Sequence, residues 1–291
     1  MQALVTGGAG FVGTNLVKRL LKENYKVWSF DNYSTGYRKN HVKGVNYGDV
    51  DVTNPFTNWV EKVDVIFHMA ALPRIKPSFH NPTEVIDVNV NGTANVLEYA
   101  RINRIPIIYA GSSSFWGGVY KNPYTFSKWQ GEELCKMYEM RYGLNITICR
   151  FYNVYGDHMP TEGGYRTVLP IFLDQIKNNL PLTVTGDGEQ RRDFTHVDDI
   201  VDAMIRIVKL NKWGSTYELG RGKNYSINEV VEIFKKHQFE KKYRVIKGKT
   251  FVDEIPGEAR NTLCKSKLAR EKLKWIPKVN LEDWIGDQLW K

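Results

Sequence analysis

The sequence predicts an α/β fold, in which a doubly wound parallel sheet is followed by a smaller α+β lobe. Three observations support this prediction. Short apolar segments alternate with helical segments in the first half of the chain, which is typical of parallel strands covered by helices on both faces. A glycine-rich turn joins the first of these strands to the first helix. After about residue 156 the alternation becomes less regular, which indicates that a second, smaller unit follows.

Six apolar segments of the first half have the length and composition of buried strands. They are the segments 3–6, 26–30, 45–50, 63–71, 105–111 and 145–151. Three longer segments, 11–23, 82–102 and 124–142, carry apolar residues at helical spacing. The second of these begins with Pro82 and the third follows Pro123, and proline is favoured at the first position of a helix.

The second half contains three more segments with helical spacing, 164–179, 198–210 and 226–237. The last one opens with Ser226, and Glu229 follows three residues later, which together predict a capping box. These segments suit a smaller α+β lobe. We therefore expect residues 1–156 to form the sheet domain, with a return segment near 193–220, and residues 157–291 to form mainly the second lobe.

The composition argues against several classes of protein. The chain has 291 residues, of which 42% are hydrophobic and 25% charged, as is usual for a globular protein. Its three cysteines (Cys135, Cys149 and Cys264) form no CxxC pair, so we expect no disulfide framework, no metal site and a cytoplasmic location. No apolar run is long enough for a membrane span. The net charge of +9 is spread along the chain, which favours a solvated basic surface over nucleic-acid binding.

The glycine-rich turn predicts a dinucleotide site. Gly7, Gly10 and Gly13 follow the first strand and open the first helix, where small residues let the backbone approach a pyrophosphate. The next strand ends in Asp31, whose carboxylate is placed to hydrogen-bond both hydroxyls of a ribose. Its charge would repel a 2′-phosphate and favours NAD, although Arg38 nearby leaves NADP as an alternative. The pattern thus predicts a Rossmann-like domain with NAD as its cofactor.

A serine cluster followed by a tyrosine and a lysine is the candidate catalytic centre. Ser112 ends a predicted strand, and Tyr124 and Lys128 are four residues apart on the next helix. A tyrosine base must lose roughly three pKa units, or about 4 kcal/mol, from its ordinary value near 10. At an effective dielectric near 20, an ammonium about 4.5 Å away contributes roughly 3–4 kcal/mol. We therefore expect Lys128 to lower the pKa of Tyr124. A polar turn before an ordinary helix is the alternative interpretation.

The same Tyr-x-x-x-Lys spacing recurs from Tyr243 to Lys247. That stretch is predicted to be a strand, in which four residues span about 13 Å, so its lysine would lie too far from its tyrosine. No serine cluster precedes it. The spacing alone is therefore weak evidence, and the context of Tyr124 gives it weight.

Eight segments together resemble the extended short-chain dehydrogenase/reductase family, specifically its NAD-dependent nucleotide-sugar epimerases and dehydratases. These are TGGAGFVG, DNYSTG, GDV, HMAA, NVNGT, YTFSK, RFYNVYG and GDGEQRRDF, and they extend over nearly the whole chain. The resemblance implies that residues 1–156 form an NAD-binding domain and that 157–291 form mainly a nucleotide-sugar-binding lobe. It also implies a homodimer, in which the helices around 82–103 and 124–142 form a four-helix interface.

The resemblance implies individual roles as well. The catalytic residues are Ser112, Tyr124 and Lys128, without a metal. The residues implied to bind the cofactor are Gly7, Gly10, Phe11, Val12, Gly13, Asp31, Asn32, Ser34, Thr35, Gly36, Asp49, Val50, Met69, Ala70, Ala71, Asn89, Ala110, Tyr124, Lys128 and Phe151. Those implied to bind the substrate are Ser112, Ser114, Asn153, Thr167, Val168, Thr183, Thr185, Arg192 and Glu258. The guanidinium of an arginine such as Arg192 suits a diphosphate.

The residues after Ser112 favour an epimerase. The family's dehydratases follow their catalytic threonine with an Asp-Glu pair, and its sugar-acid decarboxylases place a glutamate two residues on. Ser113 and Ser114 stand here instead. The resemblance therefore implies an epimerase that inverts C4 of a UDP-hexose, either UDP-glucose/galactose or a UDP-N-acetylhexosamine. Tyr124 would take the proton of the 4-hydroxyl, Ser112 would relay it, and a hydride would pass between C4 and NAD.

Other activities fit the same motifs. One alternative is an enzyme of the same fold that catalyses a different reaction on a nucleotide sugar: a 4-ketosugar reductase, a different epimerase or an atypical dehydratase. An alternative from another class is a catalytically silent, NAD-binding regulatory protein. The intact set of Ser112, Tyr124 and Lys128 argues against the second.

The chain departs from the family pattern around the expected sugar pocket. Only seven positions separate Gly117 from Tyr124, so part of the usual substrate wall is missing, and either the pocket is more open or a partner residue fills the space. A lysine found near the nicotinamide in some epimerases is Pro73 here, with Arg74 and Lys76 as the nearby cations.

Two further departures concern the C-terminal part. The arginine that often precedes the PGD or PGE motif is Ile255 here, although Glu258 is kept. Thr262 stands where the family has a bulky tyrosine that excludes an N-acetyl group. We therefore expect N-acetylated sugars to be accepted.

Overall fold

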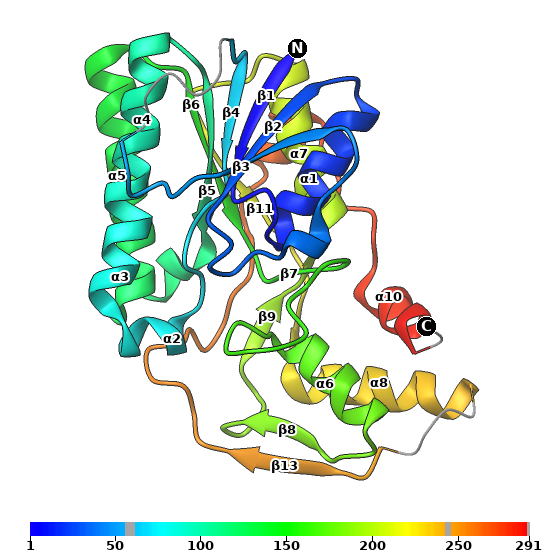
Figure 1. Cartoon of the computed structure of the whole chain (residues 1–291). Coiled ribbons are helices and arrows are strands. Elements are labelled where there is room, and N and C mark those ends of the chain that lie inside the picture. Colours follow the sequence, from blue (N-terminus) through cyan, green and yellow to red (C-terminus); the bar gives the residue numbers. More distant parts are fainter. Residues whose placement is uncertain (56–61, 242–245, 290–291) are drawn as a thin grey trace.

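Seven parallel strands form the central sheet of the protein, whose computed structural model describes residues 1–55, 62–241 and 246–289 (Figure 1). The order across the sheet is β11 (Thr216–Leu219), β6 (Ile146–Phe151), β5 (Ile107–Ser112), β4 (Val65–His68), β1 (Gln2–Thr6), β2 (Lys26–Asp31) and β3 (Val45–Asp49). All neighbouring strands run parallel. The predicted α/β class and doubly wound sheet are confirmed, and each of the six predicted strands is present.

Helices cover both faces of the sheet (Figure 1). On one face, α1 (Phe11–Lys22), α7 (Val197–Lys209) and α9 (Leu268–Leu273) enclose an apolar cluster with β1 and β11. On the other face, α4 (Gly92–Asn103) and α5 (Pro123–Tyr142) enclose a second cluster. Both faces of the strands are therefore buried, which explains their continuous apolar runs.

The helix predicted from Pro82 is continuous but not uniform. It consists of α3 (Pro82–Ile86), a π-helical segment (Asp87–Asn91) and α4. The π segment buries Asn89, whose side chain then reaches the loop after β4. The 3.6-residue spacing of the sequence did not reveal this insertion, because one wide turn shifts the apolar pattern by a single residue.

A smaller lobe lies below the sheet in Figure 1 and has its own apolar core. It contains α6 (Val168–Lys177), β8 (Leu182–Thr185) paired with β13 (Lys249–Val252), β9 (Arg191–Asp193) paired with β12 (Asn224–Ser226), α8 (Ile227–Lys241) and α10 (Leu281–Gln288). The predicted capping box of α8 is confirmed. The Ser226 hydroxyl accepts from the Glu229 N–H at 3.0 Å, and the Ser226 N–H donates to the Glu229 carboxylate at 2.8 Å.

The segment 198–210 lies within the expected return segment near 193–220. It forms α7, which packs against α1 and buries Ile200, Val201 and Met204 in the core of the sheet domain. The chain then continues into β11, the edge strand of the large sheet.

Three other expectations concern the second Tyr-x-x-x-Lys run, the cysteines and membrane spans. The second Tyr-x-x-x-Lys run begins at Tyr243, which lies outside the described residues. The three cysteines are buried, and none is in a disulfide. In the described part of the chain, no helix combines the length and apolar character needed to cross a membrane.

Candidate active site

The predicted cofactor residues lie along one edge of the sheet, where the carboxyl ends of its strands meet (Figure 1). The strand order reverses between β1 and β4, and open α/β sheets bind ligands at such a switch point. This edge holds the glycine loop after β1, Asp31 and the turn 32–36 after β2, Asp49 and Val50 after β3, Met69, Ala70 and Ala71 after β4, Ala110 and Ser112 in β5, and Phe151 at the end of β6.

Two glycines of the first loop have no room for a side chain. Gly7 has a φ of +71°, and a Cβ on it would lie 2.7 Å from the backbone nitrogen of Ala70. A Cβ on Gly13 would lie 2.0 Å from the carbonyl oxygen of Gly7. The bare backbone therefore fits closely between the end of β4 and α1. Phe11 and Val12 open α1 after the N-cap Gly10, so their N–H groups have no intrahelical acceptor and suit an anion.

The Asp31 carboxylate is buried beside this loop. It accepts hydrogen bonds from the N–H groups of Ala9 at 2.9 Å and Tyr33 at 2.8 Å. Burial raises the pKa of Asp31, and the two N–H donors oppose that rise. A Cβ on Gly36 would lie 2.9 Å from the Asp31 carboxylate, so the turn 32–36 wraps closely around it. A backbone cradle next to a buried carboxylate fits a dinucleotide with a free ribose 2′-hydroxyl.

Arg38, the residue that left NADP open in the sequence, is engaged on the surface. Its guanidinium donates to Asp49 at 2.6 Å and lies 3.9 Å from the centroid of the Tyr33 ring. The ion pair gives Arg38 a partner other than a 2′-phosphate. It also means that Asp49, one of the predicted cofactor-binding residues, takes part in a surface salt bridge.

Asn89 joins the loop after β4 to the helix that carries Tyr124. Its side-chain oxygen accepts from the Leu72 N–H at 2.8 Å, and its amide nitrogen donates to the Leu72 carbonyl at 3.1 Å and to the Ser127 hydroxyl at 2.9 Å. Ser127 in turn donates to the carbonyl of Tyr124 at 2.9 Å. Both the oxygen and the nitrogen of the Asn89 side-chain amide are therefore engaged within the protein, so this predicted cofactor residue holds the loop after β4 against α5.

The predicted catalytic serines and tyrosine come together at the start of α5. Ser112 ends β5, and its hydroxyl receives a hydrogen bond from the Tyr124 phenol at 3.4 Å. The Ser112 and Ser114 hydroxyls are 2.9 Å apart, and the Ser114 N–H donates to the Ser112 hydroxyl at 3.2 Å. Asn122 caps α5 by accepting from the Thr125 N–H at 2.8 Å, and Pro123 is its first residue. The three hydroxyls form a short chain along which a proton can pass.

The electrostatics of Tyr124 differ from the expectation. Burial raises the pKa of Tyr124, while the hydrogen bond to Ser112 and the charge of Arg74 lower it. The expected lowering by Lys128 is not found. The prediction took account of the charge of Lys128 only, whereas burial disfavours the charged phenolate and raises the pKa.

Lys128 is buried on the inner face of α5. Its ammonium lies 4.2 Å from the centroid of the Tyr109 ring in β5, and no hydrogen bond joins it to Tyr124 within the described residues. Burial lowers the pKa of Lys128 to about 8, and Glu132 opposes that shift. The side chain lies on the side of α5 that faces the sheet.

Arg74 is a cation at this site that the sequence only hinted at. It follows the end of β4 and directly precedes α2 (Ile75–His80), which packs against α5. Its Nε donates to the Tyr165 carbonyl at 3.1 Å. Lys76, the other candidate cation, is exposed on α2. Arg74 is thus the nearby cation whose charge reaches Tyr124.

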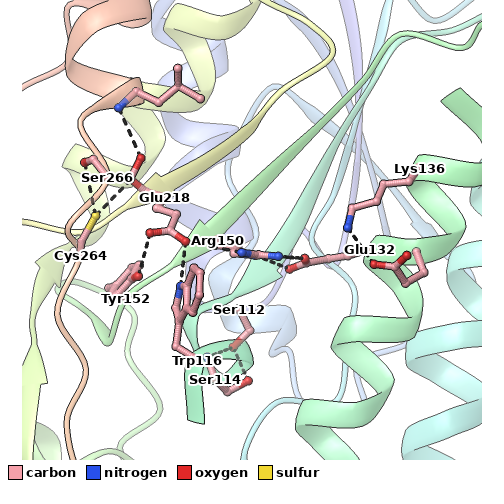
Figure 2. A network of polar contacts seen from close by, with 12 residues as sticks. Ser112, Ser114, Trp116, Glu132, Lys136, Arg150, Tyr152, Glu218, Cys264 and Ser266 are labelled. Carbon is pink, nitrogen blue, oxygen red and sulfur yellow. Dashed lines mark hydrogen bonds and ion pairs between the residues drawn. The ribbon is translucent and has the colours of Figure 1, made fainter. Parts of the chain in front are cut away.

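A buried network holds the turn that follows Ser112 (Figure 2). Arg150 in β6 makes a bidentate contact with Glu132 of α5, its closest approach being 2.6 Å, and lies 3.5 Å from Glu218 of β11. Its guanidinium also stacks 4.0 Å from the centroid of the Phe115 ring. The indole N–H of Trp116 donates to Glu218 at 2.7 Å. Two strands and α5 therefore fix the Ser113–Gly117 turn, and sequence spacing gave no sign of this network.

The short stretch between Gly117 and Tyr124 packs against a distant segment. The Asn122 amide donates to the Gly257 carbonyl at 3.2 Å, and a Cβ on Gly257 would lie 2.7 Å from the Lys121 carbonyl oxygen. A Cβ on Gly117 would lie 3.0 Å from the Cβ of Ala259. Residues 257–259 of the same chain, which include the Gly and Glu of the PGE motif, therefore lie against the loop.

The predicted substrate residues lie on several elements, and some are held by internal contacts. Arg192 is buried and forms an ion pair with Glu258 at 3.0 Å, while Thr167 and Val168 stand at the start of α6. Asn153 donates to the Thr262 hydroxyl at 3.0 Å, so this buried threonine already has a polar partner. The hydroxyls of Thr183 and Thr185 accept hydrogen bonds from Gln175 at 2.6 Å and Gln190 at 2.9 Å.

Comparisons with known proteins agree with this geometry. Residues 3–220 match the model of a family described as "NAD dependent epimerase/dehydratase family". The chain is 33% identical over 302 residues to a Methanocaldococcus jannaschii protein named "Putative UDP-glucose 4-epimerase", with 97% of this chain and 95% of that protein covered. It is 32% identical over 310 residues to UDP-glucuronic acid decarboxylase 3 of Arabidopsis thaliana, covering 98% and 87% of the two chains.

Solved structures show the same similarity. A UDP-glucuronic acid 4-epimerase from Bacillus cereus, in complex with UDP-glucuronic acid and NAD, is 25% identical, with a TM-score of 0.89 and coverage of 100% of this chain and 99% of that one. A UDP-N-acetylglucosamine 4-epimerase from Methanobrevibacter ruminantium, in complex with UDP-N-acetylmuramic acid, is 26% identical, with a TM-score of 0.88 and coverage of 99% and 98%.

Proposed function

Since the chain belongs to the NAD-dependent epimerase/dehydratase family, we propose that it is an epimerase that inverts C4 of the sugar in a UDP-hexose. The observation that carries the proposal is the hydroxyl chain of Tyr124, Ser112 and Ser114 at the carboxyl edge of the sheet. This chain can take a proton from a sugar hydroxyl and return it. The positions that hold acids in dehydratases and decarboxylases hold Ser113 and Ser114 instead.

The cofactor is NAD, in agreement with the family and with the bound molecule of the Bacillus cereus structure. In this proposal the glycine loop and the start of α1 hold its pyrophosphate, and Asp31 holds the adenosine ribose. Asn32, Ser34 and Thr35 complete the turn around that ribose. When bound, NAD supplies a reversible hydride acceptor for C4 of the sugar.

Residues of the chain itself transfer the proton of the sugar 4-hydroxyl. Tyr124 removes it as the sugar is oxidised to the 4-keto form, and Ser112 accepts and relays it along the bond to Ser114. The same groups return the proton after the 4-keto sugar has turned over in the site. Arg74 favours the phenolate of Tyr124 electrostatically. Lys128 is proposed to hold the cofactor beside Tyr124, as the family resemblance implies.

Elimination and decarboxylation are less well supported. Removing the C5 proton, as dehydration requires, needs a free base beside the sugar. Glu132, whose charge acts on Tyr124, is paired with Arg150 at 2.6 Å, and the predicted substrate residue Glu258 is paired with Arg192 at 3.0 Å. An epimerase needs neither of them free.

The identity of the hexose is a finer proposal. UDP-glucose/galactose and the UDP-N-acetylhexosamines both fit, because Thr262 is small where the family's bulky tyrosine excludes the N-acetyl group. Replacing Thr262 with Tyr should exclude N-acetylated sugars if the size of this residue controls their entry. The hydroxyl of Thr262 also holds Asn153, so that variant would disturb the pocket wall as well. Direct comparison of UDP-glucose and UDP-N-acetylglucosamine with the unaltered chain avoids the problem.

The decisive test is a panel of nucleotide sugars incubated with the purified chain and NAD. We expect C4 inversion of at least one UDP-sugar, detected by NMR of the products, and no turnover of dTDP- or GDP-sugars at comparable rates. Turnover confined to another nucleotide would contradict the UDP assignment. A chain that binds NAD tightly but converts no sugar would instead favour the silent regulatory protein.

A further inference from the structure

Trp116 is an unusual member of the turn that follows Ser112. Its side chain is 61% exposed, so packing against the core does little to hold the indole ring. Its indole N–H nevertheless donates to the carboxylate of Glu218, a buried residue of β11, at 2.7 Å. A hydrogen bond to a charged acceptor is stronger than one between neutral groups. A single directional bond therefore fixes a largely exposed aromatic side chain (Figure 2).

The bond from Trp116 to Glu218 crosses the sheet. β6 separates β5 from β11 in the strand order, so the turn after β5 reaches over β6 to contact Glu218. Arg150 of β6 contacts both sides of this bridge, because its guanidinium lies 3.5 Å from Glu218 and 4.0 Å from the centroid of the Phe115 ring. A phenyl ring has no hydrogen-bond donor. Of the two aromatic side chains of the turn, Trp116 therefore supplies the directional contact.

The Glu218 carboxylate favours keeping its donors. Besides the Trp116 N–H and the nearby guanidinium of Arg150, it accepts from the Tyr152 hydroxyl at 3.1 Å. A buried carboxylate that loses a hydrogen bond is left poorly satisfied, so each donor is held strongly. Arg150 is in β6 and Tyr152 directly follows it, so both are fixed by the sheet. Trp116 is the donor that comes from the turn after Ser112.

The turn that Trp116 anchors carries Ser114, the last hydroxyl of the proposed proton chain. The Ser114 N–H donates to the Ser112 hydroxyl at 3.2 Å, and the two hydroxyls are 2.9 Å apart. Ser114 and Trp116 belong to the same short 3-10 segment, Ser113–Gly117, so a rotation of this segment moves both contacts at once. The orientation of the Ser112 hydroxyl, which receives the Tyr124 hydrogen bond at 3.4 Å, thus depends on how the segment is anchored.

We propose that Trp116 is a positioning residue, whose hydrogen bond to Glu218 holds the turn so that Ser114 keeps the Ser112 hydroxyl oriented for proton transfer. The indole acts through Ser114 and takes no part in the proton transfer itself. This inference rests on the proposed C4 epimerase function. It predicts a specific defect when the bond is lost: the chemical step slows, while binding of the nucleotide sugar is retained.

The experiment measures kcat and KM for the UDP-sugar that the panel identifies, using the full chain with NAD. The variants are Trp116→Phe, which keeps an aromatic ring and removes the N–H donor, Ser114→Ala, the double variant, and Trp213→Phe. Trp213 is the matched control, because its indole N–H donates to Asn211 at the same 2.7 Å, but in the loop before β11, at the edge of the sheet away from the site. NAD binding and thermal unfolding report on the folding of each variant.

We expect Trp116→Phe to lower kcat about tenfold and to leave KM unchanged, as the loss of one hydrogen bond to a charged group implies. Ser114→Ala should lower kcat as well. In that background Trp116→Phe should have no further effect, because the group that Trp116 positions is already gone. Trp213→Phe should match the unaltered chain. A crystal structure of Trp116→Phe should show the Ser112 and Ser114 hydroxyls beyond hydrogen-bond distance.

Four results would overturn the inference. An unchanged kcat in Trp116→Phe, or serine hydroxyls that stay within hydrogen-bond distance in its crystal structure, would mean that the turn does not need this anchor. The same loss of kcat in the Ser114→Ala background would mean that Trp116 acts by another route. A raised KM with unchanged kcat would make the exposed indole a substrate contact instead. Failure of the proposed function looks different: the unaltered chain then inverts no UDP-sugar at C4, and the crystal structure alone decides the inference.

Discussion

At the residue scale, the acidity of Tyr124 shows what sequence spacing can and cannot predict. The spacing placed Tyr124 at the start of a helix, and its phenol lies 3.4 Å from the Ser112 hydroxyl. Its electrostatic environment was not predictable in the same way. Arg74 lies fifty positions earlier in the sequence, at a turn of positive φ directly before α2, and its charge lowers the pKa of Tyr124. No local pattern encodes that turn.

Asp31 is expected to set the choice of cofactor. Asp31→Asn removes the charge that excludes a 2′-phosphate, and a neutral amide binds the ribose hydroxyls less strongly. The ratio of Kd values, NADP over NAD, should fall at least about tenfold, as expected for hydrogen bonds to a charged group. Asp174→Asn removes the same charge from an exposed position on α6, in the smaller lobe, and should leave the ratio unchanged. If Asp31→Asn binds both cofactors as the unaltered chain does, another residue sets the preference.

His68 is expected to make the fold sensitive to acid. Its ring lies between the hydroxyls of Thr6 at 2.7 Å and Thr93 at 3.0 Å, and burial lowers its pKa to about 3. The unfolded chain binds a proton at this side chain near pH 6.5, whereas the folded chain does not, so this contribution is complete above pH 6.5 and is lost as the pH falls toward 3. Between pH 7 and 5 the loss amounts to about 2 kcal/mol.

Replacing His68 should therefore flatten the pH dependence. Urea unfolding of His68→Gln at pH 7 and pH 5 should give a smaller decrease in the free energy of unfolding than the unaltered chain shows. His80→Gln, at an exposed position on α2, is the matched control. An unchanged slope in His68→Gln would mean that other groups dominate the acid response.

At the scale of elements, most boundaries were predictable because they depend on local chemistry. Pro82, Pro123 and the Ser226 capping box begin helices where the sequence placed them. The π segment was not predictable. It depends on how the helix packs against distant elements, and the spacing of one segment contains no information about that packing.

Two helix caps provide a matched test of how elements support the site. Ser226→Ala in α8 and Asn122→Ala in α5 each remove an N-cap and should each lower the free energy of unfolding by about 1 kcal/mol. Asn122 also binds the Gly257 carbonyl and precedes Tyr124, so its loss should lower kcat/KM as well. Ser226→Ala should leave kcat/KM unchanged. Equal effects of both variants on kcat/KM would contradict a specific role for the start of α5.

At the scale of the whole molecule, the site depends on contacts between segments that are far apart in the sequence. Arg74 meets Tyr165, Arg192 meets Glu258, and the loop before Tyr124 lies against residues 257–259. Several of these residues could be identified from family motifs in the sequence. Their pairing could not be predicted, because long-range pairs depend on how complete elements pack. Residues 257–259 pack against the short loop between Gly117 and Tyr124, so the chain itself fills part of the space that a longer loop would occupy.

The predicted homodimer is a proposal at this scale. The α4 and α5 helices stand on one side of the sheet in Figure 1, and their exposed residues include Ile102, Met137, Met140 and Tyr142. Met140, at 84% exposed, is the most exposed of these. Met140→Glu should shift the chain from dimer to monomer in size-exclusion chromatography with light scattering, because a charge would be buried in the interface. A chain that is monomeric without the substitution would contradict the proposal.

The most direct test of the central claim is the reaction run in heavy water, with the UDP-sugar that the panel identifies. We predict a product inverted at C4 with no deuterium on any ring carbon, because the hydrogen removed from C4 returns to C4 and no base acts at C5. Tyr124→Phe should slow this conversion at least about 10²-fold while NAD stays bound, as expected for the loss of a general base. Deuterium at C5, a 4-keto-6-deoxy product, or near-full activity in Tyr124→Phe would contradict the account.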